Sequence, residues 1–311
     1  MSETSSTASP GGETNAVILR AFIANLGIAV AKFIAAAITG SSAMLTEGVH
    51  SLVDSLNELR LWYGAKRSRR PADTLHPLGY GRELYFWTVI VGVMIFGVGA
   101  GVSVYEGIAH IRNPVETTQP LVAFGVLGVA LALECWSLKK AVEEFQRTRK
   151  NTTLRQAIRD IKDIPTLAVL LEDSAAVAGI LIAGAGIGLE MTFDAPVFDG
   201  IASVLIGVLL AGVAVVLLRE SKHLLIGESA DPDLVRAIGE LADAEPDIVA
   251  VCEVIALQLS PESVIAVISV DFDDRMTGGE LEELSARLER DIAARFDEVE
   301  RVYMRAAGKA G

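Results

Sequence analysis

Six long apolar stretches dominate the pattern of hydrophobic and polar positions along the chain. Each is close to the ~20 residues that an α-helix needs to cross ~30 Å of hydrocarbon. We place them at 16–38, 42–64, 84–110, 119–141, 164–188 and 197–218. The first two are separated only by Gly40, Ser41 and Ser42, which indicates a tight hairpin. The pattern therefore predicts an α-helical membrane protein with six transmembrane helices.

A different pattern follows the last apolar stretch. Two amphipathic helices are expected at 231–245 and 278–296, with a start at Asp231 or Pro232 for the first. Two strands are expected within 249–273 and a last strand at 298–305. The order α-β-β-α-β predicts a small ferredoxin-like α+β domain.

The chain thus divides into three predicted parts. Residues 1–14 are small and polar and are expected to form a disordered tail. Residues 15–220 form a six-span transmembrane domain, and residues 221–311 form the C-terminal α-β-β-α-β domain.

Composition supports this division. The chain is 51% hydrophobic with a mean hydropathy of +0.43, which is too apolar for an ordinary soluble domain. The net charge is −13, and the segment from Glu228 onward holds 20 Asp or Glu against 8 Lys or Arg. Such an acidic segment is typical of a solvated domain. Because no basic patch carries interleaved aromatic residues, we expect no binding to nucleic acid.

The loops predict an orientation in the bilayer. Five Lys or Arg occur in 66–82 and eight in 139–163, whereas the loops on the other side hold one, Arg112. The positive-inside rule then places both termini in the cytoplasm. Because the tail has no recognisable signal or transit peptide, we expect a multi-pass protein of the cell inner (plasma) membrane.

Polar residues interrupt the second apolar stretch, in EGVHSLVDSLNE. Glu47, His50, Asp54 and Asn57 are three or four residues apart and therefore share one face of a helix. An ionisable group at the centre of a bilayer costs ~3 kcal/mol or more, which favours a functional role. A hydrogen bond between helices is the structural alternative. The functional hypothesis is a divalent-metal site with His50 and Asp54 as ligands.

Two side chains are too few to hold a metal ion, so another span must contribute. The fifth stretch supplies Glu172 and Asp173, its only carboxylates between Asp163 and Glu190. One imidazole and two or three carboxylates roughly neutralise a divalent cation. When the site is empty the carboxylates repel each other and attract protons. Competition between metal and protons at one site is the physical basis of a metal/proton exchanger.

The motifs TGSSAMLTEGVHSLVDSLNE and HPLGYGRELYFW resemble the second span and following loop of the cation diffusion facilitator (CDF) family, zinc transporter (ZnT) type. The form LLEDSAAV resembles the zinc transporter-nine-like subgroup. The resemblance implies six spans, a cytoplasmic C-terminal domain and a homodimer in the lipid bilayer. It also implies metal ligands at His50, Asp54 and Asp173.

One departure from the family concerns the metal. Typical zinc sites of the family have a histidine four residues before the fifth-span aspartate, where this chain has Val169. Either Glu172 substitutes or water completes the coordination. Histidine favours Zn, Co, Ni or Fe(II) over the oxygen-preferring Mg and Ca.

Two further departures concern auxiliary sites. The loop after the second span keeps Asp73 and His76 but has Tyr80 where some members have another histidine. This loop either binds an auxiliary metal or forms a His-Pro turn that caps the third span. The C-terminal domain contains no histidine, so we expect dimerisation rather than metal sensing, with Asp271, Asp273 and Cys252 as an alternative sensor site.

Other polar residues in the apolar stretches are expected to be structural. Lys32 can snorkel toward the membrane surface or pair with Glu106 or Glu134 from other spans. Asn25 is expected to form a hydrogen bond between helices. His110 is expected at the membrane interface.

The sequence predicts a homodimeric secondary transporter that exports a divalent transition metal, first of all Zn²⁺, from the cytoplasm in exchange for protons. Export of Fe²⁺, Co²⁺, Mn²⁺ or Cd²⁺ by the same mechanism is the alternative. No cofactor other than the transported cation is expected, and the absence of GxxxxGK[ST] argues against ATP-driven pumping. A metalloenzyme is disfavoured because HExxH is missing. A non-transporting metal sensor or scaffold is the remaining rival.

Overall fold

The structure, a computed structural model, describes residues 10–148 and 162–308. Most of the predicted tail and most of the basic stretch 139–163 lie outside the described residues. The chain forms two compact units. Of the described residues, the helical unit holds 10–66, 87–148 and 164–219, and the C-terminal unit holds 67–86, 162–163 and 220–308.

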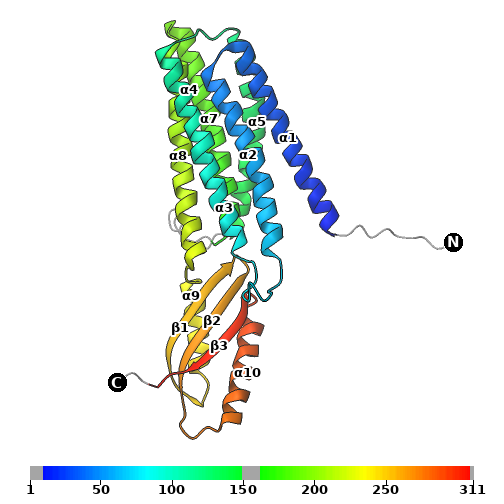
Figure 1. Cartoon of the computed structure of the whole chain (residues 1–311), viewed down its shortest axis with the longest axis vertical. Coiled ribbons are helices and arrows are strands. Elements are labelled where there is room, and N and C mark those ends of the chain that lie inside the picture. The colour runs from blue at the N-terminus through cyan, green and yellow to red at the C-terminus, as the bar shows by residue number, and fades with distance from the viewer. Residues whose placement is uncertain (1–9, 149–161, 309–311) are drawn as a thin grey trace, which may run out of the picture. The chain divides into compact units, whose positions relative to one another are not determined.

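The helical elements follow the predicted stretches, with longer bounds. They are α1 (Pro10–Thr39), α2 (Ser42–Ser68), α3 (Glu83–Met94), the π-helix η1 (Ile95–Ala100), α4 (Gly101–Arg112), α5 (Pro120–Thr148), α7 (Ile164–Phe193) and α8 (Val197–Ile226) (Figure 1). Helix α1 begins at Pro10, so residues 10–14, which were expected in the tail, are helical. Proline is well tolerated at a first helical position because its missing N–H has no partner there anyway.

Six spans are not confirmed. Within residues 10–148 and 162–308, the helices that are long and apolar enough to cross a membrane are Glu83–Arg112, Pro120–Gln146, Ile164–Phe193 and Val197–Ile226. The first of these combines α3, η1 and α4 into one continuous helix. Helix α1 contributes a shorter apolar segment, Asn25–Thr39.

Helix α2 is too polar in composition to belong to this group, and its polar side chains face the interior of the helical unit. The buried polar residues of α2 are Ser42, Thr46, Glu47, His50, Ser51, Ser55 and Asn57. The side chain of Phe33 on α1 lies against Gly48, and that of Trp87 on α3 lies against Gly64. Neighbouring helices therefore cover the polar face of α2 and keep it away from lipid, so α2 does not need to be apolar throughout.

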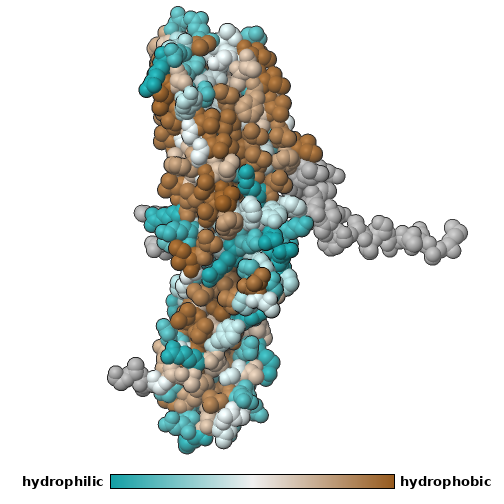
Figure 2. All heavy atoms as spheres, viewed as in Figure 1, coloured by the Kyte–Doolittle hydropathy of each residue, from teal (hydrophilic) through white to brown (hydrophobic). Residues whose placement is uncertain are grey.

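The face of the helical unit that Figure 2 shows is mainly hydrophobic, as the brown spheres over its helices indicate. Large apolar side chains that are more than half exposed include Tyr105, Leu121, Val129 and Val208. Such a surface would be costly in water and is suited to contact with lipid tails.

Glycines allow α4 and α8 to pack with their backbones in close approach. A Cβ atom on Gly107 would lie 2.7 Å from the carbonyl oxygen of Gly200 and 2.7 Å from a methyl of Val204. A Cβ on Gly207 would lie 3.0 Å from the backbone nitrogen of Val104. In lipid there is no hydrophobic driving force for helix association, so membrane helices associate largely through van der Waals packing, which small residues at such positions allow.

The C-terminal unit has the predicted order α-β-β-α-β. Its elements are α9 (Pro232–Asp243), β1 (Ile248–Ser260), β2 (Ser263–Phe272), α10 (Gly278–Arg295) and β3 (Val299–Ala306). The strands form one sheet in the order β1-β2-β3, in which β1 and β2 are antiparallel and β2 and β3 are parallel. A ferredoxin-like fold is not confirmed, because the described sheet is a mixed sheet of three strands.

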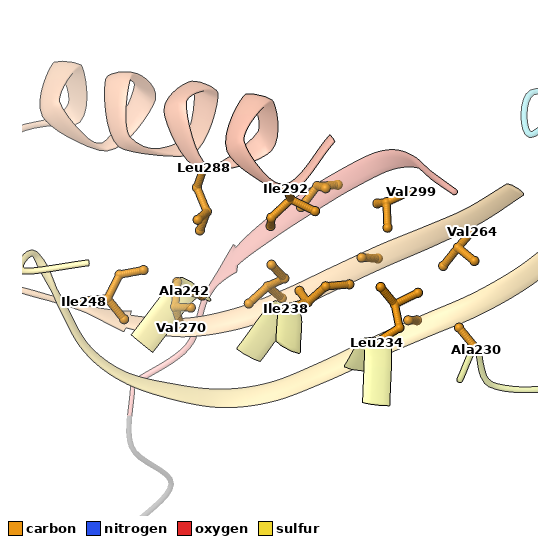
Figure 3. Packing of buried hydrophobic residues seen from close by; sticks show 14 of the residues in the cluster. Ala230, Leu234, Ile238, Ala242, Ile248, Val264, Val270, Leu288, Ile292 and Val299 are labelled. Carbon is orange, nitrogen blue, oxygen red and sulfur yellow. The ribbon is translucent and has the colours of Figure 1, made fainter. Parts of the chain in front are cut away.

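Both helices of this unit pack into one hydrophobic core with the sheet. Leu234 and Ile238 of α9 and Leu288 and Ile292 of α10 are buried against the strands (Figure 3). The predicted start of α9 is confirmed, because the side chain of Asp231 caps this helix.

Candidate metal site

His50 and Asp54 lie one turn apart on α2, as their spacing predicts. The imidazole Nδ1 of His50 lies 3.2 Å from Oδ2 of Asp54. His50 is only 2% exposed. The second atom of each group, Nε2 of His50 and Oδ1 of Asp54, is buried and has no hydrogen-bond partner in the part of the chain that the structure describes. An unpartnered buried polar atom is costly, so this pair is prepared for a ligand.

The carboxylates of α7 are each held by one side chain from another helix. Asn57 of α2 donates from Nδ2 to Oε1 of Glu172 at 2.9 Å, and Glu172 is buried. Ser137 of α5 donates from Oγ to Oδ2 of Asp173 at 2.8 Å. Both hydrogen bonds fix the carboxylates and leave other oxygens available for a cation.

The two predicted pairs interact through their charges but do not form a closed metal cage. The negative charge of Asp54 acts on both Glu172 and Asp173, and the imidazole of His50 acts on Asp173 in the opposite sense. Nevertheless, within residues 10–148 and 162–308 no group of three or more His, Cys, Asp or Glu is close enough to hold a metal ion. The structure thus brings α2 and α7 into the same electrostatic environment and leaves the ligand set open.

Two further carboxylates belong to this environment and were missed as site residues. Glu58 lies one turn beyond Asp54 on α2, and Glu134 lies on α5. The charges of Asp54 and Asp173 act on both of them. The i, i+4 spacing of Asp54 and Glu58 was a usable signal. Asn25 donates to Glu58 at 2.7 Å, which confirms the predicted hydrogen bond between helices.

The expected pairing of Lys32 with Glu106 or Glu134 is wrong. Its Nζ lies 2.9 Å from Oε2 of Glu47 and donates to Oγ of Ser51 at 2.8 Å, and Lys32 and Glu47 are both completely buried. The adjacent helices α1 and α2 are antiparallel across a tight turn, so this pair needs no third helix. The sequence contains no signal that chooses Glu47 over Glu106 or Glu134 as the partner of Lys32.

His110 is not an exposed interfacial residue. It is buried at 8% exposure, and its Nε2 lies 3.8 Å from Oδ2 of Asp199 on α8. Asp199 itself is completely buried and also interacts with the turn before α2. The spacing of apolar residues gives no information on this contact between distant segments.

The loop after α2 adopts a hydrogen-bonded turn. Oδ1 of Asp73 accepts from the backbone nitrogens of Leu75 and His76, and Oδ2 accepts from the hydroxyl of Tyr80 at 2.7 Å. These bonds, above all that from Tyr80, lower the pKa of Asp73 below its usual range. The carboxylate therefore organises the loop, and the geometry favours the turn over an auxiliary metal site.

The alternative sensor site of the C-terminal unit is also engaged in other contacts. Both oxygens of Asp273 accept from the guanidinium of Arg275, which lowers the pKa of Asp273 to about 2. The thiol of Cys252 donates to the backbone oxygen of Ala307 at 3.4 Å. These contacts satisfy Asp273 within its own turn and leave it little capacity for a metal.

Comparison with known proteins establishes the class to which this chain belongs. The cation efflux transmembrane domain matches residues 18–226, which is more than half of the chain. The chain therefore belongs to the cation diffusion facilitator family, whose members are membrane transporters of metal cations and not enzymes. This match confirms the resemblance seen in the span motifs.

Three individual relatives show which members of the family this chain is similar to. The proton-coupled zinc antiporter SLC30A9, mitochondrial, of Mus musculus is 35% identical over 247 residues, which are 79% of this chain and 44% of that protein. Metal tolerance protein C4 of Arabidopsis thaliana is 35% identical over 62% of this chain and 43% of its own length. The manganese efflux system protein MneP of Bacillus subtilis is 25% identical over 70% of this chain and 71% of its own. The chain thus spans less than half the length of its mouse and plant relatives.

The comparison overturns the expected location. The relatives from Mus musculus, Xenopus laevis and Homo sapiens are all named as mitochondrial proteins, at 34–35% identity. The prediction of the plasma membrane, and with it the cytoplasmic placement of the termini, is therefore wrong. It depended on the lack of a recognisable targeting segment, which is weak evidence for any particular membrane.

Proposed function

We propose that this protein moves Zn²⁺ across its membrane in exchange for protons, with a site formed by His50, Asp54, Asp173 and Glu172. The observation that carries the proposal is the unpartnered pair of buried atoms, Nε2 of His50 and Oδ1 of Asp54. A neutral imidazole nitrogen and a carboxylate oxygen on one helix face are common zinc ligands.

The carboxylates of α7 supply the remaining charge. The charge of Asp54 acts on both Asp173 and Glu172. Each of these two carboxylates accepts a hydrogen bond through one oxygen, from Ser137 or Asn57, which leaves the other oxygen for a cation. A buried carboxylate is neutralised by a proton or by a cation, so the two compete for the site. Binding of zinc then releases protons, and this competition couples the two fluxes.

The open ligand set fits a transport site better than a structural zinc site. A structural site is closed by its ligands, whereas a carrier must release its cargo to either side. We infer that α2 and α7 approach each other when zinc binds and separate when protons replace it. We also infer that α1 and α2 cross the membrane with the four apolar helices, because polar side chains of α2 are buried against neighbouring helices and α1 precedes α2 across a tight turn.

The proposed preference for a transition metal over magnesium and calcium has a chemical reason. Imidazole nitrogen favours zinc and its neighbours in the transition series over magnesium and calcium. Mouse and frog relatives are named as zinc antiporters, whereas the Bacillus subtilis relative is named for manganese efflux. Export of Mn²⁺, Fe²⁺, Co²⁺ or Cd²⁺ is therefore the alternative that a test must separate.

We further propose that the C-terminal unit mediates a homodimer. Its sheet carries large apolar side chains that are 42–61% exposed, namely Val249, Ile255 and Tyr303. A second copy of the chain that covers this face would bury them. Val249→Asp is expected to convert dimers to monomers in a sedimentation experiment in detergent. A monomeric wild-type protein would contradict this proposal and leave the transport mechanism untouched.

Transport is tested in proteoliposomes that enclose a pH-sensitive dye. We expect Zn²⁺ to drive proton flux more strongly than Mn²⁺, Fe²⁺, Co²⁺, Cd²⁺ or Mg²⁺. Asp54→Ala and Asp173→Ala should abolish this flux. Glu172→Gln should also abolish it if Glu172 is a ligand, and should leave it unchanged if water completes the coordination. Asp233→Ala is the matched control, because Asp233 is an exposed carboxylate on α9. Wild-type protein that moves no cation would favour a metal sensor or scaffold instead.

A further inference from the structure

The Lys32 ammonium is a cation fixed inside the helical unit. Lys32 is completely buried on α1, and it reaches α2 through Oε2 of Glu47 at 2.9 Å and Oγ of Ser51 at 2.8 Å. A buried ammonium is tolerated only when its charge is paired and its donors are used. These two contacts place it beside the helical turn that carries His50.

Glu47 has the chemistry and the position of a metal ligand. It precedes His50 by three residues on the same helix, so both side chains share one face. Its Oε1 is buried without a hydrogen-bond partner in the described part of the chain. The charges of both Glu47 and Lys32 act on the imidazole of His50. Unlike the carboxylates assigned to the site, Glu47 forms an ion pair with a buried lysine.

We propose that Lys32 determines cation selectivity, because its ion pair withholds Glu47 from the transported metal. The inference rests on the proposed function and adds to it a residue that does not touch the cargo. With Glu47 withheld, the site offers one imidazole and the carboxylates of Asp54, Asp173 and Glu172. Each added carboxylate oxygen favours harder cations, so a freed Glu47 shifts the preference from Zn²⁺ toward Mn²⁺.

The geometry makes a structural role alone insufficient. Ser51 already accepts from Lys32, and the helices α1 and α2 are also joined by Asn25 and Glu58 at 2.7 Å. A lysine that served only to join the helices would need no unpartnered carboxylate oxygen on the helix face that carries His50. The ion pair engages Oε2 and offsets the charge of Glu47, so the remaining oxygen Oε1 attracts a divalent cation less strongly than an unpaired carboxylate would.

The test compares Mn²⁺ and Zn²⁺ transport by full-length protein in proteoliposomes. In Lys32→Met, the ratio of Mn²⁺ to Zn²⁺ rates should rise by about tenfold, within the range seen when groups around a metal site are altered. Adding Glu47→Gln to this variant should return the ratio to that of the wild type. Lys32→Arg keeps the charge and should keep the wild-type ratio.

Two controls separate selectivity from folding. Lys162→Met removes a lysine from an ion pair of similar length but greater exposure, with Glu228 at 2.8 Å, and should leave the ratio unchanged. Glu47→Gln in an otherwise intact chain should still transport Zn²⁺, because the withheld carboxylate is not a ligand. This variant tests the proposal even if Lys32→Met does not fold.

Two results would overturn the proposal. One is loss of Zn²⁺ transport in Glu47→Gln as complete as in Asp54→Ala, which would make Glu47 a ligand in the intact chain. The other is folded Lys32→Met with an unchanged ratio, which would leave Lys32 a purely structural residue. In both cases wild-type protein still transports Zn²⁺, so these results differ from failure of the proposed function itself, in which the wild type moves no cation.

Discussion

The carboxylate of Asp199 on α8 accepts a hydrogen bond from the backbone nitrogen of Ser42, at 2.5 Å, at the first residue of α2. It also accepts from Oγ of Ser41 at 2.6 Å and from the backbone nitrogen of Ala43 at 3.2 Å. These N–H groups have no partner within the helix. A buried residue of α8 thereby fixes the start of the helix that carries His50 and Asp54.

Asp199→Asn should destabilise the protein by about 1–3 kcal/mol, because an amide replaces a charged acceptor and aims a donor at the helix start. Ser203→Ala removes one neutral hydrogen bond to Ser42, at 2.8 Å, and should cost about 1 kcal/mol or less. Thermal unfolding in detergent compares the two variants. Equal stability of Asp199→Asn and wild type would show that the cap contributes nothing.

The close approach of α4 and α8 gives a second prediction. Gly107→Ala should cost about 1–3 kcal/mol, because the added methyl would meet the backbone of Gly200 and a methyl of Val204 and force the helices apart. Gly125→Ala on α5 is the control, since a Cβ there meets nothing within 4 Å. Unfolding temperatures are the readout. Identical effects of the two substitutions would mean that α4 and α8 can separate at no cost.

The hydrogen bond from Ser137 to Asp173 gives a third prediction. Ser137→Ala should lower Zn²⁺ transport by about tenfold, because groups that orient a metal ligand typically contribute 10–100-fold to affinity or activity. Ser174→Ala is a matched control. Ser174 is next to Asp173, but it is exposed and its hydroxyl donates to the backbone oxygen of Leu170. Equal transport by both variants would show that Asp173 needs no orientation.

A fourth prediction concerns the loop between α2 and α3. The hydrogen bond that Tyr80 donates to Asp73 raises the pKa of Tyr80 above the usual value of about 10. This interaction stabilises the loop at pH values below about 10 and is lost as the pH rises through the raised pKa, since the phenolate cannot donate and repels the carboxylate.

Ultraviolet difference titration tests this prediction. Asp73→Asn should lower the pKa of Tyr80 toward its ordinary value, and subtraction of the Tyr80→Phe spectrum isolates the signal of this one tyrosine. If Asp73→Asn leaves the titration of Tyr80 unchanged, the hydrogen bond does not exist in solution.

Much of the fold could be predicted because local patterns determine it. The Gly40–Ser41 turn follows from glycine, which adopts a φ of 73° there at no steric cost. The α-β-β-α-β order follows from changes in hydrophobic period. The predicted number of six spans is not confirmed, because α2 carries polar side chains on a face that only tertiary packing covers.

The candidate site could be predicted only in part. His50 and Asp54 share a helix face by spacing alone, and the prediction of that contact is confirmed at 3.2 Å. Contacts between distant helices have no such signal, so the partners of Lys32 and Asp173 were not identified. The roles of His50, Asp54, Asp173 and Glu172 as ligands stay a prediction.

The most direct test of the central claim is calorimetric titration of detergent-purified protein with Zn²⁺ in two buffers of different ionisation enthalpy. We expect about one Zn²⁺ per chain, with release of protons, because metal and protons compete for the same groups. Binding and proton release should both be lost in Asp54→Ala and in Asp173→Ala, and retained in Asp233→Ala. Zinc binding that is unchanged in both aspartate variants would place the site elsewhere and contradict this account.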